Sequence, residues 1–135
     1  TQSRSSAASD VYKRQVLDWE LSTIGHPYAD LAAVIMQWSM QASKEGRGLA
    51  GIDRHAQGLM EDLEFIDRYC QIREISGIEN FGFYLAFCFF RMGGILQGVK
   101  KRALDGNASN PERALRVGSY VNNCASAGLE AAKTI

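Results

Sequence analysis

The sequence predicts a mainly α-helical protein with one short β segment near its start. The 135 residues are 46% hydrophobic and include two prolines, a composition typical of a packed, mainly helical body. Several stretches repeat apolar side chains at the three- and four-residue spacing of an amphipathic helix. A chain of this length forms one domain or part of one.

The first elements are a strand end and a helix. Residues 16–18 are predicted to end a strand, and Pro27 in the following turn suits the first position of a helix. Residues 28–40 then place apolar side chains at i, i+3, i+4 and i+7, which predicts an amphipathic helix. The residues on its expected buried face are Leu31, Val34, Ile35 and Trp38.

The middle of the chain contains a loop and a second helix. Residues 43–58 carry four glycines among mixed charges, a pattern that predicts a loop or mobile lid with room for one helical turn. Helical spacing returns in residues 61–73, where the apolar positions are Leu63, Ile66 and Cys70. Residues 77–80 break the pattern.

Residues 81–104 form the longest segment, and it is apolar nearly all round. A helix of this kind is either buried or membrane-spanning. Arg91 lies in its middle, and four glycines and Gln97 dilute it, so a membrane span would be costly. We therefore expect a buried core helix and no membrane. A buried Arg91 needs a partner, either a structural acid or an anionic group of a substrate, and Gly93-Gly94 would let another segment approach closely.

The last part of the chain predicts one more helix. Gly106 is a candidate left-handed residue that ends the long helix, and Ser109-Asn110-Pro111-Glu112 has the pattern of a capping box with proline in the first turn. The face expected to pack consists of Ala114, Val117, Val121 and Cys124.

Charge and cysteine content give no support to several classes of function. Fifteen basic and fifteen acidic residues cancel, so no strong field favours nucleic acid or an anionic membrane. The basic cluster Lys100-Lys101-Arg102 could contact a phosphate or complement a helix C-terminus. Three widely spaced cysteines favour a reduced, cytoplasmic setting over a disulfide scaffold, and we expect them to be buried.

Asp18 is the main candidate for chemistry. A carboxylate at the end of a rigid strand can hold Mg²⁺ against nucleotide phosphates, although an aspartate there can also be an exposed strand end or an N-cap. Glu20 could support such a site indirectly or be simply polar. Asp30 is expected in the first turn of the helix that begins near Tyr28, where the helix dipole favours an acid.

Two blocks of the sequence resemble the aminoglycoside phosphotransferase family of kinase-like small-molecule phosphotransferases. The first block contains the motifs Val16-Leu17-Asp18-Trp19-Glu20 and Tyr28-Ala29-Asp30-Leu31-Ala32. The second extends over residues 83–109 and begins with Phe83-Tyr84-Leu85-Ala86-Phe87. It is most similar to the subgroup found fused to, or near, acyl-CoA dehydrogenases. The resemblance covers residues 16–130.

The resemblance implies a fold, a reaction and roles for two residues. The fold would be the helical C-terminal lobe of a protein-kinase-like α+β fold. The reaction would transfer the γ-phosphoryl group of ATP to a hydroxyl of a small molecule, a hydroxyacyl-CoA-like acceptor more than an antibiotic. Asp18 would coordinate Mg²⁺ that bridges the nucleotide phosphates, and Asp30 would be structural, bonding to the backbone of the catalytic loop. Arg91 is a candidate for the acceptor pocket.

The sequence departs from the family before residue 16. Family members carry an ATP-binding lobe and a His-Gly-Asp catalytic loop there, whereas residues 1–15 are rich in Ser and Ala and read as a non-native, disordered leader. Residues 16–135 are therefore expected to form an incomplete C-terminal lobe that is inactive alone. The rival hypotheses are a non-enzymatic helical binding module and, as a weaker one, a membrane-associated helical protein.

Overall fold

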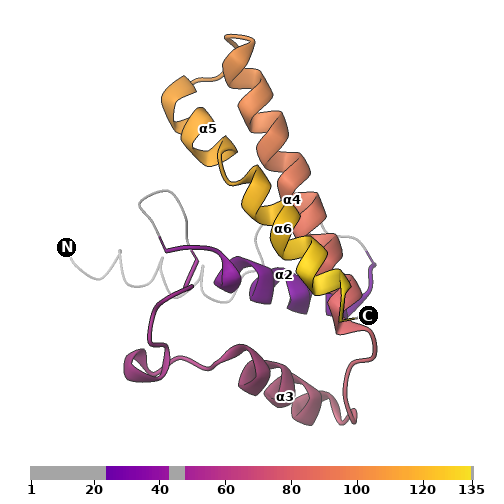
Figure 1. The fold of residues 1–135 in the computed structure, drawn as a ribbon. Helices are drawn as coiled ribbons and strands as arrows, with labels where there is room; N and C mark the ends of the chain where they lie inside the picture. The colour runs from indigo at the N-terminus through magenta and orange to yellow at the C-terminus, as the bar shows by residue number, and fades with distance from the viewer. Residues whose placement is uncertain (1–23, 43–47, 135) are drawn as a thin grey trace, which may run out of the picture.

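The computed structural model of the chain describes residues 24–42 and 48–134. The leader and the strand expected at 16–18 lie outside the described residues. The described residues are mainly helical, as the sequence predicts, and their β structure is an isolated bridge between Gln41 and Ala50. The helices are α2 (Pro27–Ser39), the 3₁₀ turn η2 (His55–Gln57), α3 (Asp62–Arg73), α4 (Phe81–Leu104), α5 (Pro111–Gly118) and α6 (Val121–Ala132) (Figure 1).

Helix α4 organises the structure. Its 24 residues give a length of about 36 Å. Helices α2, α5 and α6 all pack against it, and α5 and α6 return along it so that the C-terminus lies near its first turn (Figure 1). Helix α3 lies apart from this bundle. Cys88, Phe89 and Leu96 of α4 meet Ala32 of α2 and Cys124 of α6 in one buried cluster.

The helix expected at residues 28–40 is confirmed, with its buried face rotated from the predicted one. Val34 is 37% exposed. The residues that α2 buries are Leu31, Ala32, Ile35 and Met36. Ala32 is fully buried where α2 packs on α4. Apolar periodicity does not predict this, because alanine is only weakly apolar and is common on exposed helix faces as well.

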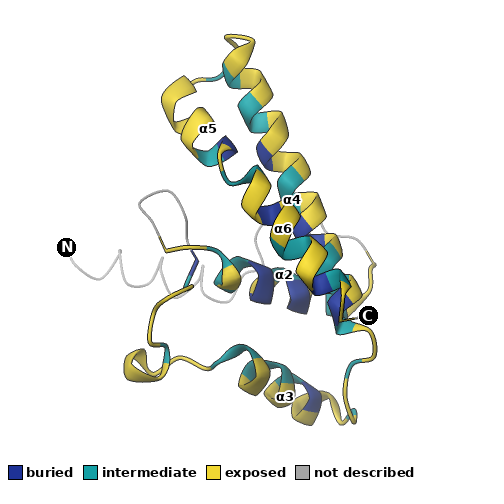
Figure 2. Ribbon diagram, in the orientation of Figure 1, coloured by how far each residue is buried: buried dark blue, intermediate teal, exposed yellow. Residues whose placement is uncertain are grey.

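Helix α4 has the predicted bounds, but the expectation that it is buried all round is wrong. Its buried residues are Gly82, Cys88, Phe89 and Leu96. Phe83, Phe87 and Phe90 are 55%, 46% and 79% exposed, because α2 and α6 cover only part of the helix surface (Figure 2). By length and composition alone α4 could also cross a membrane, since its most apolar window has a mean hydropathy of 1.3.

Glycines bring α4 and α6 together. A Cβ atom at Gly82 would lie 2.2 Å from Thr134 Oγ1 and 2.6 Å from the carbonyl oxygen of Ala131. A Cβ atom at Gly93 would make an ordinary contact of 3.6 Å with Cβ of Cys124, and one at Gly94 would meet nothing within 4 Å, so the close approach expected at Gly93-Gly94 lies instead at Gly82. The two helices therefore pack nearly backbone to backbone at the start of α4.

The turn after α4 is confirmed, and the capping box is not. Gly106 has a φ of +75°, and the N–H of Asn107 donates to the carbonyl of Arg102 at 2.8 Å, which satisfies a terminal carbonyl of the helix. Asn110, rather than Ser109, caps α5, because its Oδ1 accepts from the N–H of Arg113 at 3.0 Å.

The single last helix that the sequence predicts is two helices. Helix α5 ends at Gly118 and α6 begins at Val121. The hydroxyl of Ser119 donates to the carbonyl of Arg116 at 2.6 Å, and such local side-chain bonds compete with helix continuation. The predicted packing face is confirmed in both helices at Ala114 and Cys124, which are buried.

Arg54 fixes the described part of the glycine-rich loop. Its guanidinium donates to Asp62 Oδ1 at 2.6 Å and to Glu61 Oε2 at 2.5 Å, and it lies 5.4 Å from the ring centroid of Trp38. The hydrogen bond to Asp62 contributes most to raising the pKa of Arg54. The one helical turn expected here is η2, and the described loop is anchored to α2 and α3.

Helix α3 is confirmed at its predicted position, but its expected apolar face is mostly not buried. Leu63 is 75% exposed, Ile66 is half-buried and Cys70 is buried. Trp38 and Phe65 contact each other with ring centroids 4.8 Å apart. Aromatic contacts and the Arg54 ion pairs therefore hold α3, in place of a continuous packed face.

We predict opposite effects for two glycine substitutions in α4. Gly82→Ala should lower the free energy of unfolding by about 1–3 kcal/mol, because the new methyl group overlaps the end of α6. Gly94→Ala is the matched control: a Cβ atom there meets nothing within 4 Å, and the change should stabilise by about 0.5–1 kcal/mol. Urea unfolding followed by circular dichroism measures both, and equal effects would contradict the close packing.

Candidate active-site cleft

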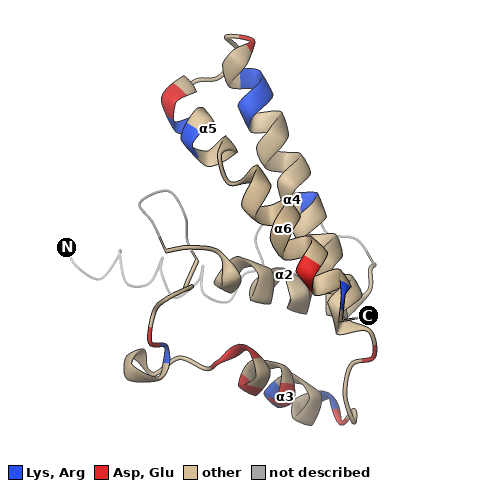
Figure 3. Ribbon diagram, in the orientation of Figure 1, with Lys and Arg blue, Asp and Glu red and all other residues tan. Residues whose placement is uncertain are grey.

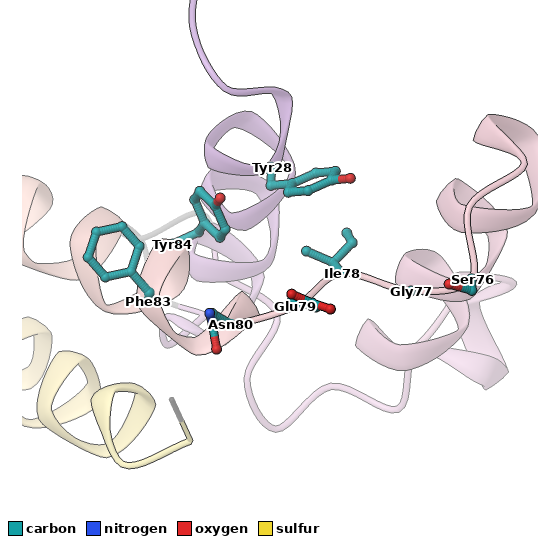
Figure 4. A pocket seen from close by; sticks show the side chains of 8 residues that line it. All are labelled: Tyr28, Ser76, Gly77, Ile78, Glu79, Asn80, Phe83 and Tyr84. Carbon is teal, nitrogen blue, oxygen red and sulfur yellow. The ribbon is translucent and has the colours of Figure 1, made fainter.

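A cleft of ≈ 750 Å³ opens where the first turns of α2 and α4 meet the connection from α3 (Figure 4). Helix α2 contributes one wall, α4 the second, and residues 76–80 the third. The residues that line it are Tyr28, Ser76, Gly77, Ile78, Glu79, Asn80, Phe83 and Tyr84.

An aromatic cluster forms the walls of this cleft. The ring centroid of Tyr28 lies 5.7 Å from that of Tyr84 and 6.3 Å from that of Tyr69, both edge to face. Phe83 lies 5.6 Å from Tyr84, and Nε2 of His26 lies 3.3 Å from the Tyr84 hydroxyl oxygen. Edge-to-face rings at these distances attract each other beyond their area burial, so the cluster ties α2, α3 and α4 together.

Sequence reasoning missed this cluster. Aromatic residues at helical spacing such as Phe83 and Tyr84 can line a pocket but are more often core, and His26 in Gly25-His26-Pro27 has the pattern of a turn. The signal available was the density of aromatic residues at the start of two helices, but the rings come from segments up to 58 residues apart. Only the packing of α2 on α4 brings them together.

Two left-handed residues direct the third wall. Glu74 ends α3 with a φ of +54°, and Asn80 precedes α4 with a φ of +53°. Asparagine tolerates this conformation and glutamate adopts it less readily. Such strain persists where the surrounding structure determines it, often at functional sites.

The polar groups of the cleft suit hydroxyl-bearing ligands. Tyr28 and Tyr84 supply phenol groups, Asn80 supplies an amide, and Glu79 is the one charged residue among those that line the cleft. A carboxylate without a nearby cation in the lining disfavours phosphate by like-charge repulsion. The cleft therefore fits a neutral or cationic group with an apolar face.

The structure separates the residues that the sequence proposed for the site. Asp18 and Glu20 lie outside the described residues, and their assignments stay predictions. Asp30 lies on the exposed surface of the first turn of α2, two residues after Tyr28. Within the described part of the chain its side chain forms no hydrogen bond or ion pair, so its predicted structural role stays a prediction.

Arg91 does not have the environment that the sequence predicted. The side chain is exposed, it does not line the cleft, and no acid among the described residues pairs with it. The prediction that it is buried is wrong, because it lies on the face of α4 that neither α2 nor α6 covers. The acceptor role of Arg91 stays an untested prediction.

The three cysteines are free and buried, as expected. The thiol of Cys88 donates to the carbonyl of Ala29 at 3.4 Å, which joins α4 to the first turn of α2. Burial raises the pKa of Cys88, while Arg91 lowers it and Asp30 raises it further. Among residues 24–42 and 48–134, no group of three His, Cys, Asp or Glu side chains could hold a metal ion.

Fold and sequence together define the class of protein. The chain superimposes with a TM-score of 0.73 and 44% identity on a Ralstonia eutropha JMP134 protein whose crystal structure is named a "putative aminoglycoside phosphotransferase". The match covers 87% of this chain and 35% of that protein. The chain is thus similar to the aminoglycoside phosphotransferase family over most of its length, and its helices are consistent with the helical C-terminal lobe of a kinase-like fold. The likeness supports a phosphotransferase-type function.

Curated relatives identify the subgroup. The chain is 44% identical over 96 residues to mouse acyl-CoA dehydrogenase family member 10, covering 70% of the chain and 9% of that protein. It is 41% identical over 124 residues to chicken acyl-CoA dehydrogenase family member 11, covering 89% of the chain and 16% of that protein. It thus spans less than a fifth of these relatives. No protein-family model matches the chain.

We predict that the chain loses stability in alkaline solution through Cys88 and Cys124. Burial raises the pKa of both thiols above the ordinary 9.0, so the folded state keeps its protons at a pH where the unfolded state releases them. This contribution is complete below about pH 9 and is lost as the pH rises through the raised values.

Urea unfolding at about pH 7 and about pH 10 measures this loss. A Cys88→Ala, Cys124→Ala double variant should be less stable at neutral pH because cavities remain. Its further loss between the two pH values should be smaller than in the wild type. If the double variant lost as much unfolding free energy between the two pH values as the wild type, the pH dependence would come from groups other than these two thiols.

Proposed function

We propose that this chain is the acceptor-binding part of an enzyme that transfers the γ-phosphoryl group of ATP to a hydroxyl of a small molecule. The observation that carries the proposal is the 44% identity and TM-score of 0.73 to a protein named for this reaction class. The reaction depends mainly on positioning and on charge neutralisation, so the geometry at the start of α2 is central to it.

The cleft beside Tyr28 supports this proposal. Tyr28 comes ten residues after Asp18 in the sequence, and Asp30 occupies the same helical turn as Tyr28. The segment with the proposed metal ligand therefore leads directly into one wall of the cleft. A hydroxyl acceptor bound in this cleft would contact Tyr28, which lies ten residues after Asp18 and two residues before Asp30 in the sequence.

Magnesium binding in this proposal rests on Asp18. The described residues provide no three-ligand cluster of their own, so they do not form a metal site without Asp18 and further groups. Mg²⁺ would neutralise the nucleotide phosphates when bound. Glu20 would support Asp18 indirectly, and Asp30 would hold the backbone of the catalytic loop.

The chemistry of the cleft favours an acceptor with a neutral, hydroxyl-bearing part. Aromatic rings offer apolar surface, while the Tyr hydroxyls and Asn80 can orient a hydroxyl group. We propose a hydroxyacyl group, and the acyl-CoA dehydrogenase family relatives favour a CoA-linked form of it. We place the enzyme in the cytoplasm, with no nucleic acid or membrane partner.

We predict that Asp18→Asn lowers kcat about 10²–10⁴-fold in the enzyme that contains this segment, because the change removes the charge that holds the metal. Folding should be retained. Asp67→Asn, on the exposed face of α3, is the matched control and should leave kcat unchanged. Near-wild-type turnover in Asp18→Asn would show that the metal assignment is wrong.

We predict that the 135-residue chain by itself does not turn over ATP. Residues 1–15 contain neither the His-Gly-Asp loop nor the Gly-rich loop that family members carry before the Asp18 segment, and phosphoryl transfer needs several positioned groups at once. The measurement is ATP hydrolysis with Mg²⁺ against a boiled sample. Mg²⁺-dependent turnover above that background would contradict the prediction. A non-enzymatic binding module would also be inactive in this assay, and it differs from the proposed enzyme part in that it would bind no hydroxyl acceptor.

A further inference from the structure

The neutral chain separates its charges along its length. Residues 100–116 contain five basic and two acidic residues, a net charge of +3, whereas residues 53–79 contain three arginines and seven acids, a net charge of −4. The positive segment forms the tip where α4 turns into α5, and the negative segment contains α3 at the opposite end (Figure 3). The tip formed by residues 100–116 is therefore electropositive, although the net charge of the whole chain is zero.

Ion pairs neutralise only part of this tip. Lys101 pairs with Asp105, and Arg116 lies 3.8 Å from Glu112. Both acids of the segment are used in these pairs. Arg102 has no hydrogen bond or ion pair of its side chain within the described residues.

The ends of the helices do not account for Arg102. Cations near a helix C-terminus can satisfy its last carbonyls, but backbone groups already do so here. The carbonyl of Arg102 accepts from Asn107 at 2.8 Å, and that of Ala103 accepts from Gly106 at 3.2 Å. The guanidinium of Arg102 therefore keeps its donors available.

A second cleft lies beside this guanidinium. It has a volume of ≈ 490 Å³, lies between the last turns of α4 and the first turns of α5, and has no carboxylate among its lining residues. Its polar lining residues are Arg102, Asn107, Ser109, Asn110 and Arg113. In the cleft beside Tyr28 the one charged lining residue is instead an acid, Glu79.

The frame of this second cleft is fixed before any ligand binds. The left-handed Gly106 closes the turn after α4, and the Asn110 side chain caps α5. Gly118 packs so tightly on Lys100 that a Cβ atom would lie 2.6 Å from Cβ of the lysine. Both arginines of the cleft are thus held on helices whose spacing is set, which lowers the entropic cost of binding.

We propose that this cleft binds the phosphate group of a small molecule. Guanidinium groups match the oxygens of phosphate in two-pronged hydrogen bonds, and the hydroxyl and amide groups of Ser109 and Asn107 add donors. The site lies 18 residues along α4 from Tyr84, a distance of about 27 Å. It is therefore separate from the proposed active-site cleft and does not depend on the proposed function.

Calorimetric titration of the 135-residue chain with inorganic pyrophosphate at constant ionic strength tests the proposal. Saturable binding with a Kd below about 10 mM is expected. Arg102→Gln should weaken it at least about tenfold, the loss typical of a hydrogen bond to a charged group. Arg102→Lys should weaken it less. The matched control, Arg68→Gln on the acidic helix α3, should change Kd less than about twofold.

No saturation up to about 10 mM, or equal weakening in Arg68→Gln, would overturn the proposal, because the signal would then be absent or come from the general charge. Glycerol 3-phosphate in place of pyrophosphate separates the sources: tighter binding of the ester identifies an organic phosphate, and tighter pyrophosphate identifies a free inorganic one. Circular dichroism confirms folding, and Arg113→Gln replaces Arg102→Gln if that variant unfolds.

Discussion

The close contact between α4 and α6 is the constraint on which the rest of the structure depends. Gly82 lies so near the carbonyl of Ala131 that no larger residue fits without movement of the backbone. This contact fixes the C-terminal helix along α4, and α5 follows because it joins the two. Interiors packed this tightly transmit strain, so the position of the cleft between α4 and α5 follows from the spacing of these helices.

A neighbouring face of α4 holds the elements that concern chemistry. Helix α2 packs there through Ala32 and through the hydrogen bond from Cys88 to the carbonyl of Ala29. These contacts set the direction in which the first turn of α2 presents Tyr28 and Asp30. The proposed active-site cleft is therefore a consequence of core packing, and a change in the core should be felt there.

Helix α3 is attached in a different way. The side chain of Arg54 is 12% exposed, and it joins Glu61 and Asp62 at the start of α3 to the ring of Trp38. A planar guanidinium can make both contacts at once. With few apolar contacts, α3 is expected to open at lower free energy than the α4–α6 pair, which would let one wall of the proposed active-site cleft move while the core stays folded.

The sequence by itself determined the helices whose signals are local. The bounds of α4, the left-handed Gly106 and the proline at the start of α2 all follow from periodicity and backbone chemistry. The family resemblance also came from sequence, because the motif around Asp18 and Asp30 has a specific order and spacing.

Only the tertiary structure decided which faces of these helices are buried. Arg91 and Phe90 lie on an exposed face of a helix that looks apolar all round, because burial depends on which neighbours arrive and not on composition. The aromatic cluster around Tyr84 and the cleft beside Arg102 likewise join segments that local patterns treat separately. Close approach at a glycine is set by the same packing, which acts between residues far apart in the chain.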